Sequence, residues 1–243
     1  MKGSKRIDNL SLKIISNIVL SVLMLSVGVL CLAPMQQEVA TDGKDANLYR
    51  SATQNAKGVS LMFNVYWGTN EVYEILDILS QHSAKATFFI GGCWADDNVE
   101  CLKKIYENGH EIGNHGYFHK EHSKMSLTAN QKEINDCNRF IKLALGIDCV
   151  LFAPPSGAYN ADTLAACKAL QMKTILWSKD TIDWRDKDAS VIYTRATKNV
   201  QCGDFVLMHP MAATVSALDD ILKYYEKNSL NLVTVSENLQ ENG

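Results

Sequence analysis

Two histidines four residues apart, His115 and His119, lie in the segment NHGYFHKEH. This is a common metal-binding spacing, because neutral imidazoles on one face of a helical turn converge on one cation. The pair follows a predicted strand at 111–114, and this position favours a metal site. The alternative is two solvated histidines in a loop.

A second polar cluster lies in WSKDTIDWRD, which contains Asp180, Asp183 and Trp184. His209 ends the predicted strand that comes next along the chain. A carboxylate beside a histidine orients the imidazole and favours its protonated form, so Asp183 and His209 could form a general acid. The alternative for a single histidine on an apolar strand is a packed core residue.

These residues are separated by alternating strand and helix patterns. Short apolar runs predict strands at 59–65, 86–90, 111–114, 150–153, 173–178, 204–209 and 231–235. Helical periodicity predicts helices at 70–82, 98–108, 127–145, 161–171, 189–199 and 214–228.

The alternation predicts an α/β fold in which a mostly parallel sheet is covered by helices. Units of about 27 residues are slightly shorter than those of an eight-unit barrel and fit a distorted (β/α) barrel of about seven strands. An open doubly wound sheet is the alternative. Both architectures place chemistry at the carboxyl ends of the strands, where the residues above are found.

Composition excludes several classes of protein. The chain has 243 residues, of which 47% are hydrophobic and 21% charged, so it is not a disordered or low-complexity protein. The net charge is −3, which gives no basic excess for nucleic acid. No G-x-G-x-x-G or P-loop motif occurs, so we expect no nucleotide partner.

The N-terminus resembles a membrane-targeting segment. Residues 1–13 carry four basic side chains and one acidic one, and the 21 residues of 14–34 carry no charge. An α-helix needs about 20 apolar residues to cross a bilayer. We expect domains at 1–34 (basic flank and membrane or signal segment), 35–57 (linker) and 58–243. An uncleaved anchor with an extracytoplasmic domain at the cell membrane is favoured; the alternatives are a cleaved signal, which gives a secreted protein, and a buried core helix.

Six segments, taken in order, resemble the NodB-type polysaccharide deacetylases (carbohydrate esterase family 4), nearest the sporulation-associated branch. They are VSLMFNVYWGTN, ATFFIGG, NGHEIGNHGYFH, LFAPPSGAYN, WSKDTIDWRD and FVLMHP. The resemblance covers residues 58–239. It implies a distorted barrel, a divalent metal that is often zinc, and removal of acetyl groups from N-acetylated sugars of peptidoglycan or chitin-like polymers.

The resemblance also implies roles for individual residues. His115 and His119 match the two metal histidines, His209 matches the acid that protonates the leaving amine, and Asp183 matches the carboxylate that tunes this acid. Parts of the groove wall are matched by Trp184 and by the turn Pro155, Ser156 and Gly157, which could offer a backbone N–H to an oxyanion.

The chain departs from this family in its first segment. Asn64 stands at the position of the general base, and an amide cannot accept a proton from water. Val65 stands at the position of the third metal ligand and cannot coordinate. Ala153 replaces the arginine that pairs with the base, so both partners of that ion pair are absent. The site would be weakened for metal unless Asn64, Asp180 or water completes it.

Two functions follow from these departures. The first is a slow metal-dependent deacetylase in which Asp180 or hydroxide replaces the base. The second is a catalytically silent glycan-binding protein of the cell wall or spore, with Tyr66, Trp67, Trp177 and Trp184 as stacking surfaces for sugars. Core packing is the alternative role for Trp177.

Six cysteines follow residue 34, an even number that permits disulfides outside the cytoplasm. Cys93 with Cys101 and Cys137 with Cys149 are the pairs that lie close in sequence, and they are the predicted bridges.

Overall fold

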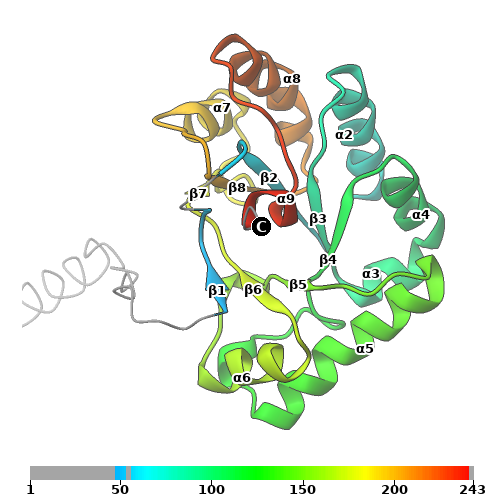
Figure 1. Ribbon diagram of the computed structural model, residues 1–243. Coiled ribbons are helices and arrows are strands. Elements are labelled where there is room, and N and C mark those ends of the chain that lie inside the picture. The colour runs from blue at the N-terminus through cyan, green and yellow to red at the C-terminus, as the bar shows by residue number, and fades with distance from the viewer. Residues whose placement is uncertain (1–46, 53–55, 241–243) are drawn as a thin grey trace, which may run out of the picture. The chain divides into compact units, whose positions relative to one another are not determined.

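The computed structural model describes residues 47–52 and 56–240, and this part of the chain is built around one parallel sheet (Figure 1). The eight strands pair in the order β1-β6-β5-β4-β3-β2-β8-β7. They are β1 (Leu48–Tyr49), β2 (Ser60–Val65), β3 (Thr87–Ile90), β4 (Glu111–Asn114), β5 (Leu151–Phe152), β6 (Lys173–Ile175), β7 (Lys179–Asp180) and β8 (Phe205–Met208).

The sheet curls into an incomplete barrel. Beyond β1, the N–H of Ala52 donates to the carbonyl of Gly203 at 2.9 Å, and Ser51 forms a bridge with Asp204 just before β8. One edge of the sheet therefore curls round to the start of β8, near the opposite edge. The prediction of a distorted α/β barrel is confirmed, with eight strands in place of about seven.

Helices cover the outside of the sheet, as Figure 1 shows. They are α2 (Thr69–Gln81), α3 (Gly92–Asp97), α4 (Val99–Glu107), α5 (Leu127–Leu145), α6 (Ala161–Ala169), α7 (Ala189–Thr197) and α8 (Ala212–Lys227). The bounds of α5 match the prediction because its ends are encoded locally. The Ser126 hydroxyl accepts from the N–H of Ala129, and Gly146 ends the helix at φ 76°.

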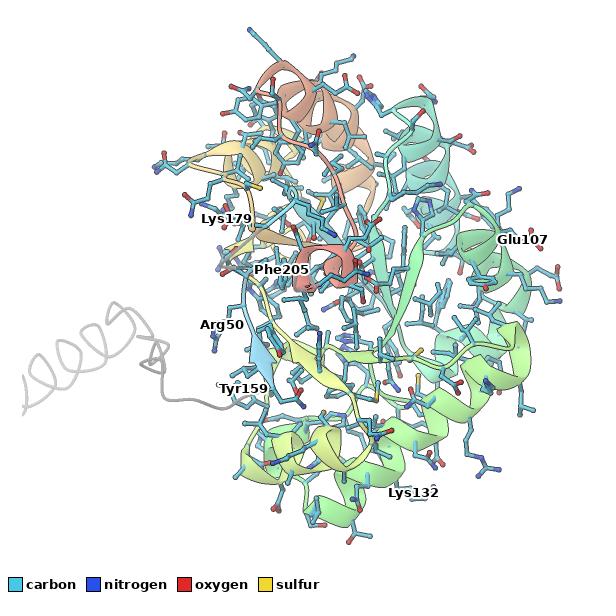
Figure 2. All side chains as sticks on the ribbon, in the orientation of Figure 1. Arg50, Glu107, Lys132, Tyr159, Lys179 and Phe205 are labelled. Carbon is cyan, nitrogen blue, oxygen red and sulfur yellow. The ribbon has the colours of Figure 1, made fainter. Side chains whose placement is uncertain are left out.

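Each central strand is buried on both faces, because successive side chains point to opposite sides. Phe63 packs outward in the larger core beneath the helices, whereas Met62 packs inward in a smaller cluster inside the barrel. Phe205, labelled in Figure 2, belongs to the inner cluster, as do Leu151 and Ala153. Asn64, two residues after Met62, therefore faces the barrel interior.

The last predicted strand, 231–235, is wrong. Leu232 makes a single bridge to Val59, and the chain then enters the short helix α9 (Val235–Leu239). Thr234 and Glu237 form a reciprocal capping box, in which each side chain accepts from the other's N–H, and this favours a helix over a strand. The N–H of Val235 donates to Thr87 at the start of β3, so α9 lies at the amino ends of the strands and the carboxyl ends are left for a site.

Two strands were not predicted because they are only two residues long. β1 lies within the predicted linker 35–57, and β7 lies in a polar loop. The predicted membrane or signal segment of 1–34 falls outside the described residues. In the ranges 47–52 and 56–240, no helix combines the length and apolarity needed to span a bilayer.

The predicted disulfides are wrong, because all six cysteines of the described chain are free thiols. Cys101, Cys137, Cys149 and Cys167 are buried, and they serve as small apolar residues of the outer core. Burial raises the pKa of Cys101 to about 11 and that of Cys149 to about 12, which keeps both thiols protonated.

Candidate active site

The residues singled out from the sequence gather at the carboxyl ends of the strands. Phe63 of β2 pairs with Met208 of β8, so the next residues, Asn64 and His209, lie at the same level on neighbouring strands. Two strands along the sheet from β2, His115 follows β4 and lies level with Ala153 after β5. The fold thus brings the two predicted clusters to the same open end of the barrel, formed by the carboxyl ends of the strands. We call this end the mouth.

His115 and His119 lie together, with ring centroids 5.1 Å apart. His115 is 2% exposed, and its Nδ1–H donates to the carbonyl of Ala153 at 2.7 Å. This bond leaves the lone pair on Nε2. Burial, and then the neighbouring His119, hold the pKa of His115 well below its usual value, and burial also lowers the pKa of His119. Both rings are therefore neutral near pH 7.

The loop between the two histidines, residues 116–118, is held in place by buried polar groups. The N–H of Gly116 donates to the Asn114 side chain at 2.7 Å, and the N–H of Phe118 donates to the Glu133 carboxylate. His119 itself adopts a left-handed φ of 52°. Glu133 was missed in the sequence, although a carboxylate on the buried face of α5 is a recognisable signal, since it must have a partner.

Tyr66 packs against His119, with ring centroids 4.6 Å apart. A glycine makes this possible, because a Cβ on Gly91 would lie 2.5 Å from the Tyr66 ring. Gly91 is therefore required by the Tyr66 ring, and a Cβ on the next residue, Gly92, would lie 2.3 Å from the ring of Tyr117.

Asp183 and His209 form the predicted pair. Asp183 is fully buried and accepts three hydrogen bonds: from the backbone N–H of His209 at 2.6 Å, from its Nδ1–H at 2.7 Å and from the Thr214 hydroxyl at 2.6 Å. The carboxylate thereby fixes the ring and leaves Nε2 free. Thr214 was missed, although its position on the apolar stripe of α8, four residues before Leu218, is unusual for a polar residue.

Aromatic side chains flank this pair. Trp67 stacks on His209 with centroids 5.8 Å apart and planes 5° apart, and its Nε1–H points to the sulfur of Met211 at 3.2 Å. Trp184 is exposed. Trp177, in contrast, packs on the inner cluster and against Gly157, which agrees with the core-packing alternative.

The chain makes a tight turn after β5 at Pro155–Gly157, and the N–H of Gly157 donates to the carbonyl of Pro154 at 2.9 Å. Pro155 is buried, whereas Ser156 is exposed and has a left-handed φ of 56°. A Cβ on Gly157 would lie 2.8 Å from the Trp177 ring, so this wall is fixed by packing.

The position of the general base holds an unsatisfied amide. Asn64 is 3% exposed, and its Oδ1 has no hydrogen-bond partner among the described residues. Val65 packs in the outer core, so its side chain points away from the mouth. Asp180 accepts from the N–H of Ile182 at 2.8 Å, and burial raises its pKa.

The residues do not fit a zinc centre of the usual kind. Such centres use three or four protein ligands. Within 47–52 and 56–240, no three His, Cys, Asp or Glu side chains are placed to share a metal ion, so Asp180 does not complete a site with His115 and His119. The described residues offer two neighbouring imidazoles, those of His115 and His119.

Comparison with known proteins gives the same family from sequence and from structure. The sequence model of the family described as polysaccharide deacetylase matches residues 51–175. The peptidoglycan-N-acetylglucosamine deacetylase of Bacillus cereus is 34% identical over 194 residues, which cover 76% of this chain and 90% of that protein. The uncharacterized protein YlxY of Bacillus subtilis is 36% identical over 75% of this chain, which spans only 57% of YlxY.

The crystal structure of BA3943 from Bacillus anthracis, described as a CE4 family pseudoenzyme, matches with a TM-score of 0.77 and 34% identity. The match covers 80% of this chain and 69% of that one. A BA3943 mutant described as having restored enzymatic activity matches with the same TM-score and 32% identity. The chain therefore belongs to the polysaccharide deacetylase family.

Proposed function

We propose that this protein binds N-acetylated cell-wall polysaccharide at the mouth of its barrel and has lost the half of the deacetylase reaction that generates the nucleophile. The observation that carries this proposal is the position of Asn64. A buried amide stands where the family has its general base, and its oxygen has no hydrogen-bond partner within the described part of the chain.

Two other positions, Val65 and Ala153, also lack the side chains that the family uses for the reaction. The side chain of Val65 is turned into the outer core, and Ala153 is fully buried with no charge to offer. Removing a general base alone slows a reaction by about 10²–10⁴-fold. This site lacks the general base, the third metal ligand and the arginine that pairs with the base. We therefore expect it to bind a substrate rather than to hydrolyse it.

The mouth retains features suited to binding an acetylated sugar. Tyr66, Trp67 and Trp184 present aromatic faces that can stack on the apolar faces of sugar rings.

Slow deacetylation is the second candidate, and one observation favours it. Asp183 accepts three hydrogen bonds and holds His209 with Nε2 free to protonate a leaving amine. In this case the acid half works without its base. Under either candidate, the apolar segment 14–34 would hold the domain at the outer face of the membrane or release it by cleavage.

The test measures binding and chemistry on the same samples. The full chain is titrated with N-acetylglucosamine oligomers, and acetate release is followed with and without chelator. We expect binding that persists in chelator and acetate release indistinguishable from buffer. Trp184→Ala should weaken binding about five- to tenfold through lost stacking, whereas Tyr106→Ala, an exposed aromatic on α4, should not.

Each outcome selects one reading. Acetate release that stops in chelator, in His115→Ala and in His209→Ala would support slow deacetylation. Absence of both binding and acetate release would refute both candidates.

A further inference from the structure

A cavity of about 530 Å³ lies beside the candidate site, separated from His209 by Trp67. One face of the indole is stacked on the imidazole, so the cavity meets its other face or its edge. Pro210 and Met211, which directly follow His209, also line the cavity, and the Met211 sulfur holds the indole N–H. The cavity therefore adjoins the candidate site, and the Trp67 side chain forms the wall between them.

The cavity opens into a longer groove. A second cavity of about 510 Å³ between α7 and α8 shares Ala189 and Ser216 with the first. Together they form a track that begins at Trp67 and runs along the crevice between these two helices. A track of this shape fits an extended chain better than one sugar ring.

The groove carries charges of both signs. Glu71 and Lys187 line the first cavity, and neither forms an ion pair or a side-chain hydrogen bond within the described chain. Asp220 and Lys227 line the second cavity, also without an ion pair to the described residues. The remaining wall of the first cavity is mostly alanine, proline, methionine and tryptophan. A neutral glycan cannot form ion pairs with these side chains. A peptide can, because its amine pairs with an acidic side chain and its carboxylates pair with a basic one.

We propose that this groove binds a short peptide carried on the glycan, as peptidoglycan carries its stem peptides. The peptide's carboxylates lie near Lys187, and its free amine lies near Glu71. This inference rests on the proposed function and specifies its ligand: a peptide-bearing glycan in preference to an unsubstituted chitin-like polymer.

The distances allow one ligand to occupy both places. A group stacked on the far face of Trp67 lies roughly 9–10 Å from the His209 ring, since van der Waals contact adds about 3.5–4 Å. Three extended residues span roughly that length, at about 3.3–3.6 Å each. A sugar at the mouth can therefore reach the groove with the first residues of its peptide.

The experiment compares three probes by titration calorimetry with the full chain. They are a chitin tetramer, a peptidoglycan tetrasaccharide bearing stem peptides, and the free tripeptide L-alanyl-D-glutamyl-diaminopimelate. We expect the peptide-bearing fragment to bind about tenfold tighter than the chitin tetramer, with a preference that shrinks at high salt. Lys187→Glu should remove about five- to tenfold of that affinity and leave chitin binding unchanged. Lys168→Glu, a reversal on the surface of α6, is the matched control and should change none of the three.

The outcomes separate this inference from the proposed function. Equal affinities for the two glycans, with no effect of Lys187→Glu, would overturn the peptide groove while leaving glycan binding intact. Binding of the free tripeptide alone would support the groove and refute the glycan proposal. Failure of all three probes to bind would refute both.

Discussion

A double-mutant cycle at positions 64 and 153 tests whether the missing base and the missing arginine were one structural unit. Asn64 shares the inward-facing parity of Met62 on β2, and Ala153 belongs to the same inner cluster. Asn64→Asp and Ala153→Arg would therefore place opposite charges in one barrel interior. Each variant alone would bury an unpaired charge.

The expected magnitudes follow from burial. Asn64 is 3% exposed and Ala153 is fully buried, so the lone aspartate should cost about 3–5 kcal/mol, unless it takes up a proton. The lone arginine should cost a similar amount for its charge, with about 1–3 kcal/mol more for overpacking. Because the overpacking cost occurs in both arms of the cycle, it cancels. The remaining coupling should be favourable by about 2 kcal/mol.

The assay is urea unfolding of all four proteins in a buffer with added sulfate, which keeps the weaker variants folded. Ala153→Gln replaces the arginine as a long uncharged control, and its coupling to Asn64→Asp should stay below about 0.5 kcal/mol. A coupling of zero or of unfavourable sign for the arginine pair would refute the idea that these two sites face one another. Equal coupling for glutamine would show that bulk, not charge, is responsible.

Further predictions concern metal, dyad, pH and thiols. Because the histidine pair lacks a third acidic ligand, 100 µM Zn²⁺ should shift the melting temperature by less than about 1 °C, and a chelator-sensitive rise of several degrees would contradict this. Asp183→Asn should cost about 3 kcal/mol, or roughly 6–12 °C in melting temperature, whereas His209→Gln should cost less because the backbone N–H bond remains. Burial would lower the pKa of His82, but its hydrogen bonds to Glu226 and Asp219 and their charges raise the pKa overall. Its stabilising contribution is thus complete below about pH 6.5 and lost as pH rises through the raised value, so the stability difference between wild type and His82→Gln should shrink toward alkaline pH in urea melts. All six described cysteines should alkylate in denaturant without reductant, as read from the mass shift.

The fold was largely predictable where local signals and hydrophobic pattern agreed. Helix α5 was predicted to the residue because Ser126 and Gly146 define its ends. The sheet edges were not predictable, since β1 and β7 are two residues long and are held by pairing with strands far away in sequence. The error at 231–235 was avoidable, because Thr234 and Glu237 form a capping box that outweighs the apolar run.

The sequence predicted which residues line the site, but it did not predict the hydrogen bonds that hold them in place. Histidine spacing and strand ends located His115, His119 and His209, and resemblance supplied the meaning of Asn64. The supporting residues Thr214 and Glu133 were missed, because they lie on helices outside the recognised motifs. Both are polar residues on the apolar face of a helix. A polar side chain at such a position indicates a buried hydrogen-bond partner.

Retention of the acid half is weaker support for catalysis than it first looks, because Asp183 also has a structural role. It binds the backbone N–H of His209 and the hydroxyl of Thr214, so it joins the end of β8 to α8. Replacing it would leave buried donors without an acceptor. The Asn64 oxygen, in contrast, has no hydrogen-bond partner among residues 47–52 and 56–240. Asp183 is therefore required for packing whether or not the chain catalyses a reaction, so its presence does not by itself distinguish slow deacetylation from glycan binding alone.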